Sequence, residues 1–259
     1  MTRLNSLPQT LNDSLRQRNL LKVISGLSNF DGSSVSRIAS ASGLGGADLL
    51  DVACDPYLVG IALEKSGLPI CVSAVDASLF PAAVKAGASM IEIGNFDSFY
   101  PQGRVFSAEE VIELAIETRS LLPDVVLSVT VPHVLPLDKQ AQLALDLVDV
   151  GADLIQTEGG TSSTPKHPGT LGLIEKAAPT LAAAHMINAS LIENGSSVPI
   201  LCASGLSVVT VPMAFSVGAT GVGVGSVVNR LSDELEMIAM IRNLRQAIMS
   251  SRSLAPLTL

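Results

Sequence analysis

A short motif that recurs four times constrains the fold of this chain more than any other feature of its sequence. Each copy is a glycine, a small residue and then a mostly apolar run, and the copies start at Gly46, Gly87, Gly151 and Gly218. A glycine in the left-handed conformation ends a helix, and the apolar run behind it begins a strand. The copies are 41, 64 and 67 residues apart, and the last two spacings are about twice a strand-helix-strand repeat of roughly 30 residues. The motif therefore marks alternate strands of an α/β fold.

Other apolar runs, bounded by turn residues, lie between these copies and bring the number of predicted strands to eight: 20–24, 70–75, 125–131 and 200–203. A helical pattern follows each strand, near 34–42, 56–66, 79–86, 108–122, 138–150, 171–192, 208–217 and 233–250. Eight such units in about 240 residues are typical of a (β/α)8 TIM barrel. We predict one barrel domain over residues 1–259, with a short N-terminal helix near 7–17 that caps its bottom. An open Rossmann-like sheet is the main alternative, but no G-x-G-x-x-G follows the first strand.

Composition and charge narrow the possible partners. Hydrophobic residues make up 47% of the chain, and aromatic residues only 3%, which suits buried parallel strands of Val, Ile, Leu and Ala. A net charge of −8 disfavours nucleic acid as a partner. The uncharged stretch 194–229 contains too many glycines and prolines for a membrane span. The three cysteines (Cys54, Cys71 and Cys202) lie far apart in or next to apolar runs and predict buried, reduced thiols. The first 18 residues lack the apolar core of a signal peptide, so we expect a cytoplasmic location.

Strand alternation predicts a polar barrel interior. Residues two apart on a strand share a face, and the apolar positions Leu50, Val52, Ile91, Ile93, Ile155, Val222 and Val224 are assigned to the helix-facing side. The opposite face then carries Lys22, Asp51, Ser73, Glu92, Ser128, Thr130, Gln156, Glu158 and Ser204. Lys22 is the only Lys or Arg within a predicted strand. Three interpretations stay open. Lys22 forms a buried ion-pair network with Glu92 or Asp51, or it is a general acid or electrophile with Glu92 or Glu158 as general base. The third is a Schiff-base role for Lys22.

Two glycine-rich turns indicate a phosphate site. They follow the seventh and eighth predicted strands and contain Ser204, Gly205, Gly225 and Ser226. Loops at these two places of a barrel often bind phosphate, because glycines let backbone N–H groups approach the anion. The alternative is that these glycines only permit tight turns.

Two long loops add further candidates. The polar loop 158–170 predicts a lid, with Gly159, Gly160 and Thr161 near the ligand, or else a solvated surface loop. The loop 95–107 holds half of the chain's aromatic residues, which either cover an organic ring or pack the loop or a subunit interface. Asn95 and His133 are additional pocket candidates. No spacing of His, Cys or carboxylate residues indicates a metal site, so none is predicted.

The segments Ile91-Glu92-Ile93-Gly94-Asn95-Phe96-Asp97-Ser98-Phe99-Tyr100 and Gln156-Thr157-Glu158-Gly159-Gly160 resemble the hypothetical chloroplast open reading frame 23 family of cyanobacteria and algal plastids. The resemblance runs from about residue 18 to residue 245 and implies a cytoplasmic or stromal barrel. The closing turns look like those of phosphate-binding barrels such as thiazole synthase, indole-glycerol-phosphate synthase and the sugar-phosphate epimerases. Class I aldolases would carry a Schiff-base lysine where Gln156 stands, which argues against that chemistry.

These features favour a lyase, isomerase or synthase that acts on a small phosphorylated metabolite. The alternatives are a non-catalytic metabolite-binding or regulatory protein and a barrel that binds FMN through the same phosphate site. No other cofactor is predicted. The aromatic surface loop makes a homodimer plausible.

Overall fold

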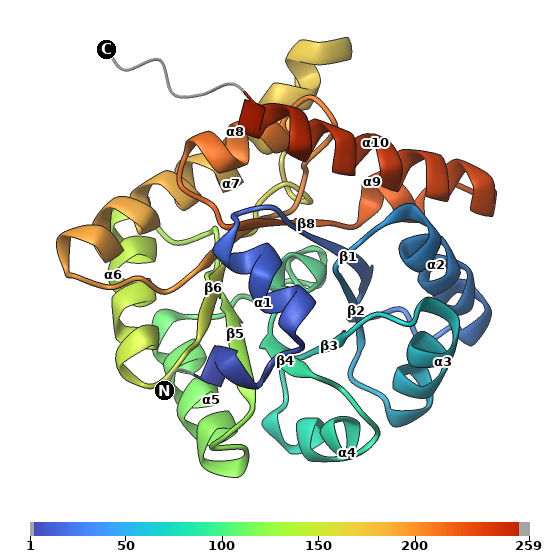
Figure 1. Ribbon diagram of the computed structural model, residues 1–259. Helices are drawn as coiled ribbons and strands as arrows, with labels where there is room; N and C mark the ends of the chain where they lie inside the picture. Colours follow the sequence, from blue (N-terminus) through green and yellow to red (C-terminus); the bar gives the residue numbers. More distant parts are fainter. Residues whose placement is uncertain (1–2, 254–259) are drawn as a thin grey trace.

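The computed structural model describes residues 3–253 and is a closed barrel of eight parallel strands in the order β1 to β8 (Figure 1). This confirms the (β/α)8 prediction, although residues 1–2 and 254–259 of the expected domain lie outside the described residues. Each strand pairs with the next one, and β8 pairs with β1. The strands are β1 (Leu20–Gly26), β2 (Leu49–Ala53), β3 (Ile70–Ala74), β4 (Met90–Ile93), β5 (Val126–Thr130), β6 (Leu154–Gln156), β7 (Ile200–Ala203) and β8 (Gly221–Val224).

The helices form the outer layer of the barrel (Figure 1). They are α2 (Gly32–Gly45), α3 (Pro56–Ser66), α4 (Phe80–Lys85), α5 (Ala108–Leu121), α6 (Leu137–Asp149), α7 (Gly169–Glu193), α8 (Val211–Ser216), α9 (Ser226–Asn229) and α10 (Glu234–Ser253). Short 3-10 turns are η1 (Arg3–Ser6), η2 (Ala77–Leu79), η3 (Phe96–Ser98) and η4 (Tyr100–Gln102).

Local sequence explains where several helices begin. The Asp55 carboxylate accepts hydrogen bonds from the N–H groups of Tyr57 and Leu58, and Pro56 occupies the first position of α3. The helix predicted for 208–217 begins only at Val211, because residues 207–210 form a turn closed by the Thr210 amide on the Ser207 carbonyl. These local signals place the ends of the elements within a few residues of their predicted positions.

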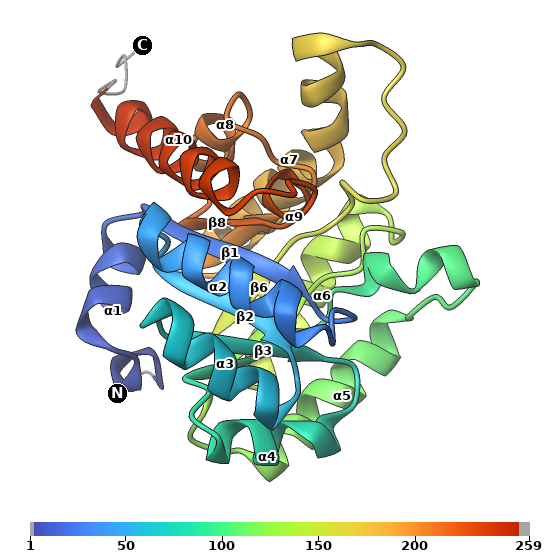
Figure 2. The ribbon, with the colours of Figure 1, turned by 90° about the vertical axis from the view of Figure 1, so that its right-hand side faces the viewer.

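The predicted capping helix is α1 (Gln9–Arg16), and it lies across the N-terminal end of the barrel (Figure 2). Its buried Leu11 and Leu15 pack with Leu7 on the lowest inward-facing strand residues, Leu20, Leu49, Cys71, Met90, Val126, Leu154 and Leu201. This apolar plug closes the bottom of the barrel, so a ligand can enter only at the C-terminal end.

The predicted alternation of strand residues is confirmed for most positions. The seven residues assigned to the helix-facing side all belong to the apolar shell between strands and helices. Ser204 is an exception: the inward residues of β7 are Leu201 and Ala203, so its assignment to the inward face was wrong. Ser204 follows the strand with a left-handed φ of 75°, which turns its hydroxyl toward the loop after β6.

The predicted burial of the cysteines is confirmed, because Cys54, Cys71 and Cys202 are all buried. Within residues 3–253, no helix has both the length and the apolar character needed to cross a membrane.

Candidate functional site

A layer of polar side chains, here called the interior network, fills the barrel one level above the apolar plug. Six strands contribute to it, and every member is buried. Its members are Lys22 on β1, Asp51 on β2, Ser73 on β3, Glu92 on β4, Ser128 and Thr130 on β5, and Gln156 on β6. The structure thus brings together most of the residues that strand alternation predicted to face inward.

Lys22 and Glu92 form the central ion pair of the interior network. The Lys22 ammonium lies 2.6 Å from Glu92 Oε2 and 3.5 Å from Asp51 Oδ2. Ser128 and Gln156 also donate hydrogen bonds to Glu92, at 2.9 and 2.6 Å, and Ser73 donates to Asp51 at 2.6 Å. The two carboxylates are therefore paired and hydrogen-bonded, as buried charges must be.

Burial and neighbouring charges set the protonation of this layer. Burial raises the pKa of Asp51 to about 7, with the charge of Glu92 adding to the shift and Lys22 opposing it. Burial alone would lower the pKa of Lys22, but the negative charges of Glu92 and Asp51 outweigh it and raise that pKa. At neutral pH the layer thus holds a charged Lys22 ammonium and an Asp51 carboxyl near its midpoint of titration.

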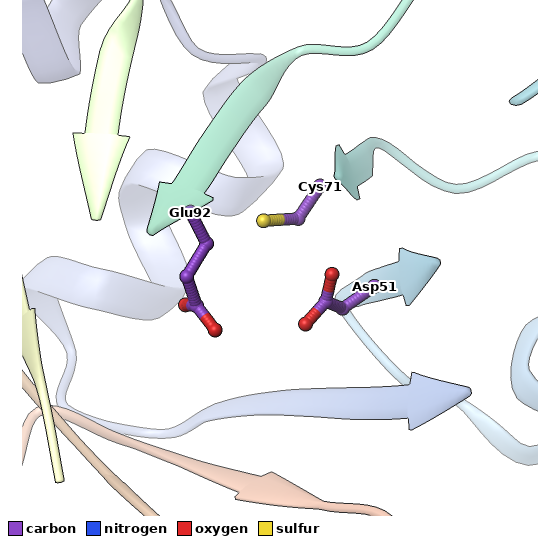
Figure 3. A group of neighbouring side chains, drawn as sticks. All are labelled: Asp51, Cys71 and Glu92. Atoms are coloured by element: carbon purple, nitrogen blue, oxygen red, sulfur yellow. The ribbon is translucent and has the colours of Figure 1, made fainter. Parts of the chain in front are cut away.

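Asp51, Cys71 and Glu92 point toward one another from β2, β3 and β4 (Figure 3). Their ligand atoms lie within 4.8 Å of one another, which is a spacing that could hold a metal ion. The ammonium of Lys22 already lies against both carboxylates. It supplies the positive charge that a metal ion would otherwise bring to this group. Burial, followed by the charge of Asp51, also raises the pKa of the Cys71 thiol well above its usual value, which disfavours the thiolate that a metal binds.

A cavity of about 270 Å³ opens at the C-terminal end of the barrel, over β1 and the turns that follow β7 and β8. Six predicted ligand-binding or pocket residues line it: Asn95, Thr161, Ser204, Gly205, Gly225 and Ser226. Its other lining residues are Ile24, Gly26, Ser98, Asn229 and Arg230. Sequence reasoning missed Arg230, although a basic residue shortly after the last glycine turn was a usable signal.

Ile24 separates this cavity from the interior network. It is the next inward residue of β1 above Lys22 and lines the cavity, whereas Lys22, Asp51 and Glu92 do not. Gly223 on β8 makes room for it, since a Cβ there would lie 2.9 Å from Ile24 Cδ1. The predicted catalytic carboxylates on the strands thus lie beneath the floor of the cavity.

A second polar group, here called the loop cluster, ties the loops at the C-terminal end together. It consists of Asp97, His133, Glu158 and Ser162, which follow β4, β5 and β6. His133 Nδ1 lies 3.2 Å from Glu158 Oε1 and 3.4 Å from Asp97 Oδ1, and its Nε2 lies 2.7 Å from Ser162 Oγ. Burial alone lowers the pKa of His133, but its hydrogen bond with Glu158 and the charge of Asp97 outweigh burial and raise it.

Glu158 belongs to the loop cluster and not to the interior network. Its carboxylate accepts hydrogen bonds from the backbone N–H groups of Phe96, Asp97 and His133 and from the Tyr100 hydroxyl. Strand alternation no longer holds there, because β6 ends at Gln156. In the structure Glu158 joins three loops, and its contacts are distinct from those of Lys22.

Gly159 and Gly160 do not line the cavity with Thr161. The Gly159 amide donates to Asp97 Oδ2 at 3.1 Å. Gly160 packs against Gly205, since a Cβ on Gly160 would lie 2.3 Å from the Gly205 Cα atom. The two glycines bring the loop after β6 into backbone contact with the turn after β7.

The aromatic residues of the loop after β4 pack mainly on one another. Phe106 lies 4.6 Å from Phe96 and 5.5 Å from Phe99 between ring centroids, and the Arg104 guanidinium lies 4.2 Å from the Phe106 centroid. Of the two interpretations of this loop, the contacts favour internal packing. No aromatic ring lines the cavity among the described residues.

The fold and the site define a class of protein: a (β/α)8 barrel with a small polar cavity on its two closing turns. Comparison with known families then gives the particular family, because the one described as "Protein of unknown function (DUF561)" matches residues 5–254. The chain belongs to this family. It is 43% identical over 239 residues to the "Uncharacterized protein ycf23" of Cyanophora paradoxa, covering 92% of this chain and 96% of the relative. For the protein of the same name in Porphyra purpurea, the identity is 39% and the coverage 92% and 88%.

Solved structures with a similar fold include enzymes that are named for phosphorylated compounds. The (S)-3-O-geranylgeranylglyceryl phosphate synthase from Thermoplasma acidophilum, in complex with sn-glycerol-1-phosphate, has a TM-score of 0.60 at 15% identity and covers 96% of this chain and 99% of its own. The thiamine phosphate pyrophosphorylase from Pyrococcus furiosus has a TM-score of 0.58 at 15% identity and covers 92% and 98%. At these identities the likeness shows the fold alone.

Proposed function

We propose that the protein binds a small phosphorylated metabolite in the cavity on the closing turns. The observation that carries this proposal is the convergence of Gly205, Gly225, Ser226 and Arg230 on one cavity. Glycine turns let backbone N–H groups approach a phosphate, and a guanidinium adds a charge with matching geometry. The named substrate of one structural neighbour, sn-glycerol-1-phosphate, belongs to the same chemical class.

The chemistry that fits best is general acid/base catalysis of the lyase, isomerase or synthase type. Lys22 would act as acid or electrophile and Glu92 as base, with Asp51 as a proton reservoir. A carboxyl with a pKa of about 7 can gain and lose protons at neutral pH, which suits acid/base catalysis. Ile24 has to move for a substrate in the cavity to reach these groups. Location in a cytoplasm or plastid stroma, as the family resemblance implies, and a homodimer stay predictions.

The second candidate is a non-catalytic metabolite-binding protein. The observation that favours it is the interior network itself, which is paired, hydrogen-bonded and buried below the cavity floor. For FMN binding the structure offers no aromatic face at the cavity among the described residues.

The first experiment is native mass spectrometry of gently purified protein, followed by denaturing extraction of any copurified small molecule. A phosphorylated compound would support the proposal and name the substrate class; a released flavin would support the FMN alternative.

Calorimetric titration with inorganic phosphate then tests the site itself. Arg230→Glu should weaken phosphate binding at least tenfold, because it places a carboxylate in the cavity. The control is Arg16→Glu, which makes the same charge change near the opposite end of the barrel and should leave phosphate affinity unchanged. Equal affinity in both variants would contradict the proposed site.

The identified ligand then separates the two candidates. Product formation that is lost in Glu92→Gln, with ligand binding retained, supports catalysis by the interior network. Tight binding without any product supports the non-catalytic alternative.

A further inference from the structure

The three loops of the loop cluster bring three metal-type donor atoms together above the barrel. His133 Nδ1 lies 3.2 Å from Glu158 Oε1 and 3.4 Å from Asp97 Oδ1, and the three donors lie within 4.8 Å of one another. Ligands bound to one dication at roughly 2.1 Å are about 3.0 to 3.4 Å apart in octahedral or tetrahedral geometry. The two distances from His133 match this range.

The charges of the loop cluster are not balanced by a fixed cation. Asp97 and Glu158 are each 1% exposed, and within residues 3–250 no Lys or Arg side chain forms an ion pair with either of them. In the interior network, by contrast, Lys22 provides that charge. A divalent cation bound to a neutral imidazole would balance the two carboxylates of the loop cluster.

The surroundings of the three donors have the features of an outer coordination shell. Metal-binding histidines are usually oriented through their other ring nitrogen, and metal-binding carboxylates by further hydrogen bonds. His133 Nε2 lies 2.7 Å from Ser162 Oγ, and the Tyr100 hydroxyl donates to Glu158 Oε1 at 2.5 Å. Asp97 Oδ1 faces His133 and accepts a hydrogen bond from Ser162 Oγ at 2.8 Å, while Asp97 Oδ2 accepts from Ser204 Oγ at 2.8 Å.

The site also has a route from solvent. The side chain of His133 is 16% exposed, and Ser162 beside it lies on the surface. An ion can therefore reach the two buried carboxylates from the His133 side without passing through the barrel.

We propose that Asp97 Oδ1, His133 Nδ1 and Glu158 Oε1 bind one divalent transition-metal ion, which takes the place of the proton on His133 Nδ1. One imidazole and two carboxylates form a mixed donor set that suits Mn²⁺ or Zn²⁺. Ser204 links the site to the phosphate cavity, because it bonds to Asp97 and lines the cavity. The ion would thus lie behind the cavity wall and add positive charge there.

Calorimetric titration of chelator-treated, full-length protein with Zn²⁺ and with Mn²⁺ tests this proposal, and Co²⁺ serves as a visible probe. We expect one ion per chain, a rise in melting temperature and Co²⁺ absorption bands of a nitrogen–oxygen site. His133→Gln and Asp97→Asn should each lower the affinity at least about 100-fold. Tyr100→Phe, which removes only an outer-shell hydrogen bond, should lower it about tenfold.

His167→Gln is the matched control, because His167 Nδ1 lies 2.6 Å from Glu175 Oε1 in an exposed pair outside the site. It should leave the stoichiometry and the affinity unchanged. Arg230→Glu should also keep the metal while losing phosphate, so that failure of the phosphate site and failure of the metal site are distinguishable. No bound ion in the parent protein, or equal binding in His133→Gln and the parent, would overturn the proposal. Circular dichroism and Tyr100→Phe, a milder change, keep the test decisive if Asp97→Asn does not fold.

Discussion

The interior network and the loop cluster each contain two buried carboxylates near one basic side chain, yet they are stabilised differently. In the interior network the carboxylates extend from strands, and an ammonium lies between them. In the loop cluster they extend from loops and accept mostly backbone N–H groups, with an imidazole beside them. The comparison shows that strand carboxylates need a charged side chain, because their neighbours' N–H groups are used in the sheet. Loop carboxylates instead join the loops by accepting hydrogen bonds from backbone N–H groups that are not used in the sheet.

Loss of the interior cation should have the largest effect. Lys22→Met leaves the buried Glu92 carboxyl without its ion-pair partner, and removal of one member of a buried pair costs about 3 to 5 kcal/mol of unfolding free energy. Urea denaturation at pH 6, where Asp51 is mostly protonated, measures this loss. The exposed Lys85→Met on α4 is the control. The double variant Lys22→Met/Glu92→Met should recover more than half of the lost unfolding free energy. A loss below about 1 kcal/mol in Lys22→Met alone would contradict the buried ion pair.

The titration of Asp51 should have the next largest effect. The pKa of Asp51 is about 7 in the folded protein, against 3.8 ordinarily. A raised carboxyl pKa gives stability that is fully present below about pH 4 and is lost as pH rises to about 7, by at most about 4 kcal/mol. The unfolding free energy of the parent, relative to Asp51→Asn, should therefore be higher at pH 5 than at pH 8. Asp149→Asn, an exposed change on α6, should show no such trend, and a flat difference for Asp51→Asn would exclude the raised pKa.

Asp97→Asn should have a smaller effect that is confined to the loops. The amide group would face the N–H groups of Gly159 and Thr161, which now donate to Asp97 Oδ2, and we expect a cost of about 2 to 3 kcal/mol. Hydrogen exchange should become faster in residues 157–168 and stay unchanged in β1 to β4. Faster exchange throughout the barrel would show that the two polar groups are not independent.

Tyr100→Phe should have the smallest effect, about 1 kcal/mol of unfolding free energy, because it removes one hydrogen bond to a charged acceptor that keeps its other donors. Thermal unfolding of this variant beside Tyr57→Phe, a change at a residue that is 71% exposed, isolates the contribution of the Tyr100 hydroxyl. A cost equal to that of Tyr57→Phe would mean that the Glu158 contact contributes nothing.

The sequence alone was sufficient to predict the members of the interior network, but it was insufficient to predict those of the loop cluster. On a strand, a period of two fixes the face of each residue, so Lys22, Asp51, Glu92 and Gln156 could be placed together from their positions. The same rule failed at Ser204, where a left-handed φ follows the strand. It also misplaced the contacts of Glu158, which lies beyond the end of β6.

Asp97 was missed because no periodicity fixes the direction of a loop side chain. Asp97 lies in the segment that carried the family resemblance, and that was the one available signal. Its partners Gly159 and Ser204 are 62 and 107 residues away along the chain. Contacts of that range depend on closure of the barrel, which a local pattern does not contain.

The apolar plug, which α1 and the lowest strand residues form together, has a consequence for proton exchange. Leucines on α1 and at the lowest strand positions separate Asp51 from water at the N-terminal end. At the other end Ile24 lies between Lys22 and the cavity, which opens toward solvent. A proton that leaves Asp51 therefore travels through the end where a ligand would sit. Ligand occupancy and the lifetime of that proton are kinetically linked, so a filled cavity should slow the equilibration of the barrel interior with bulk pH.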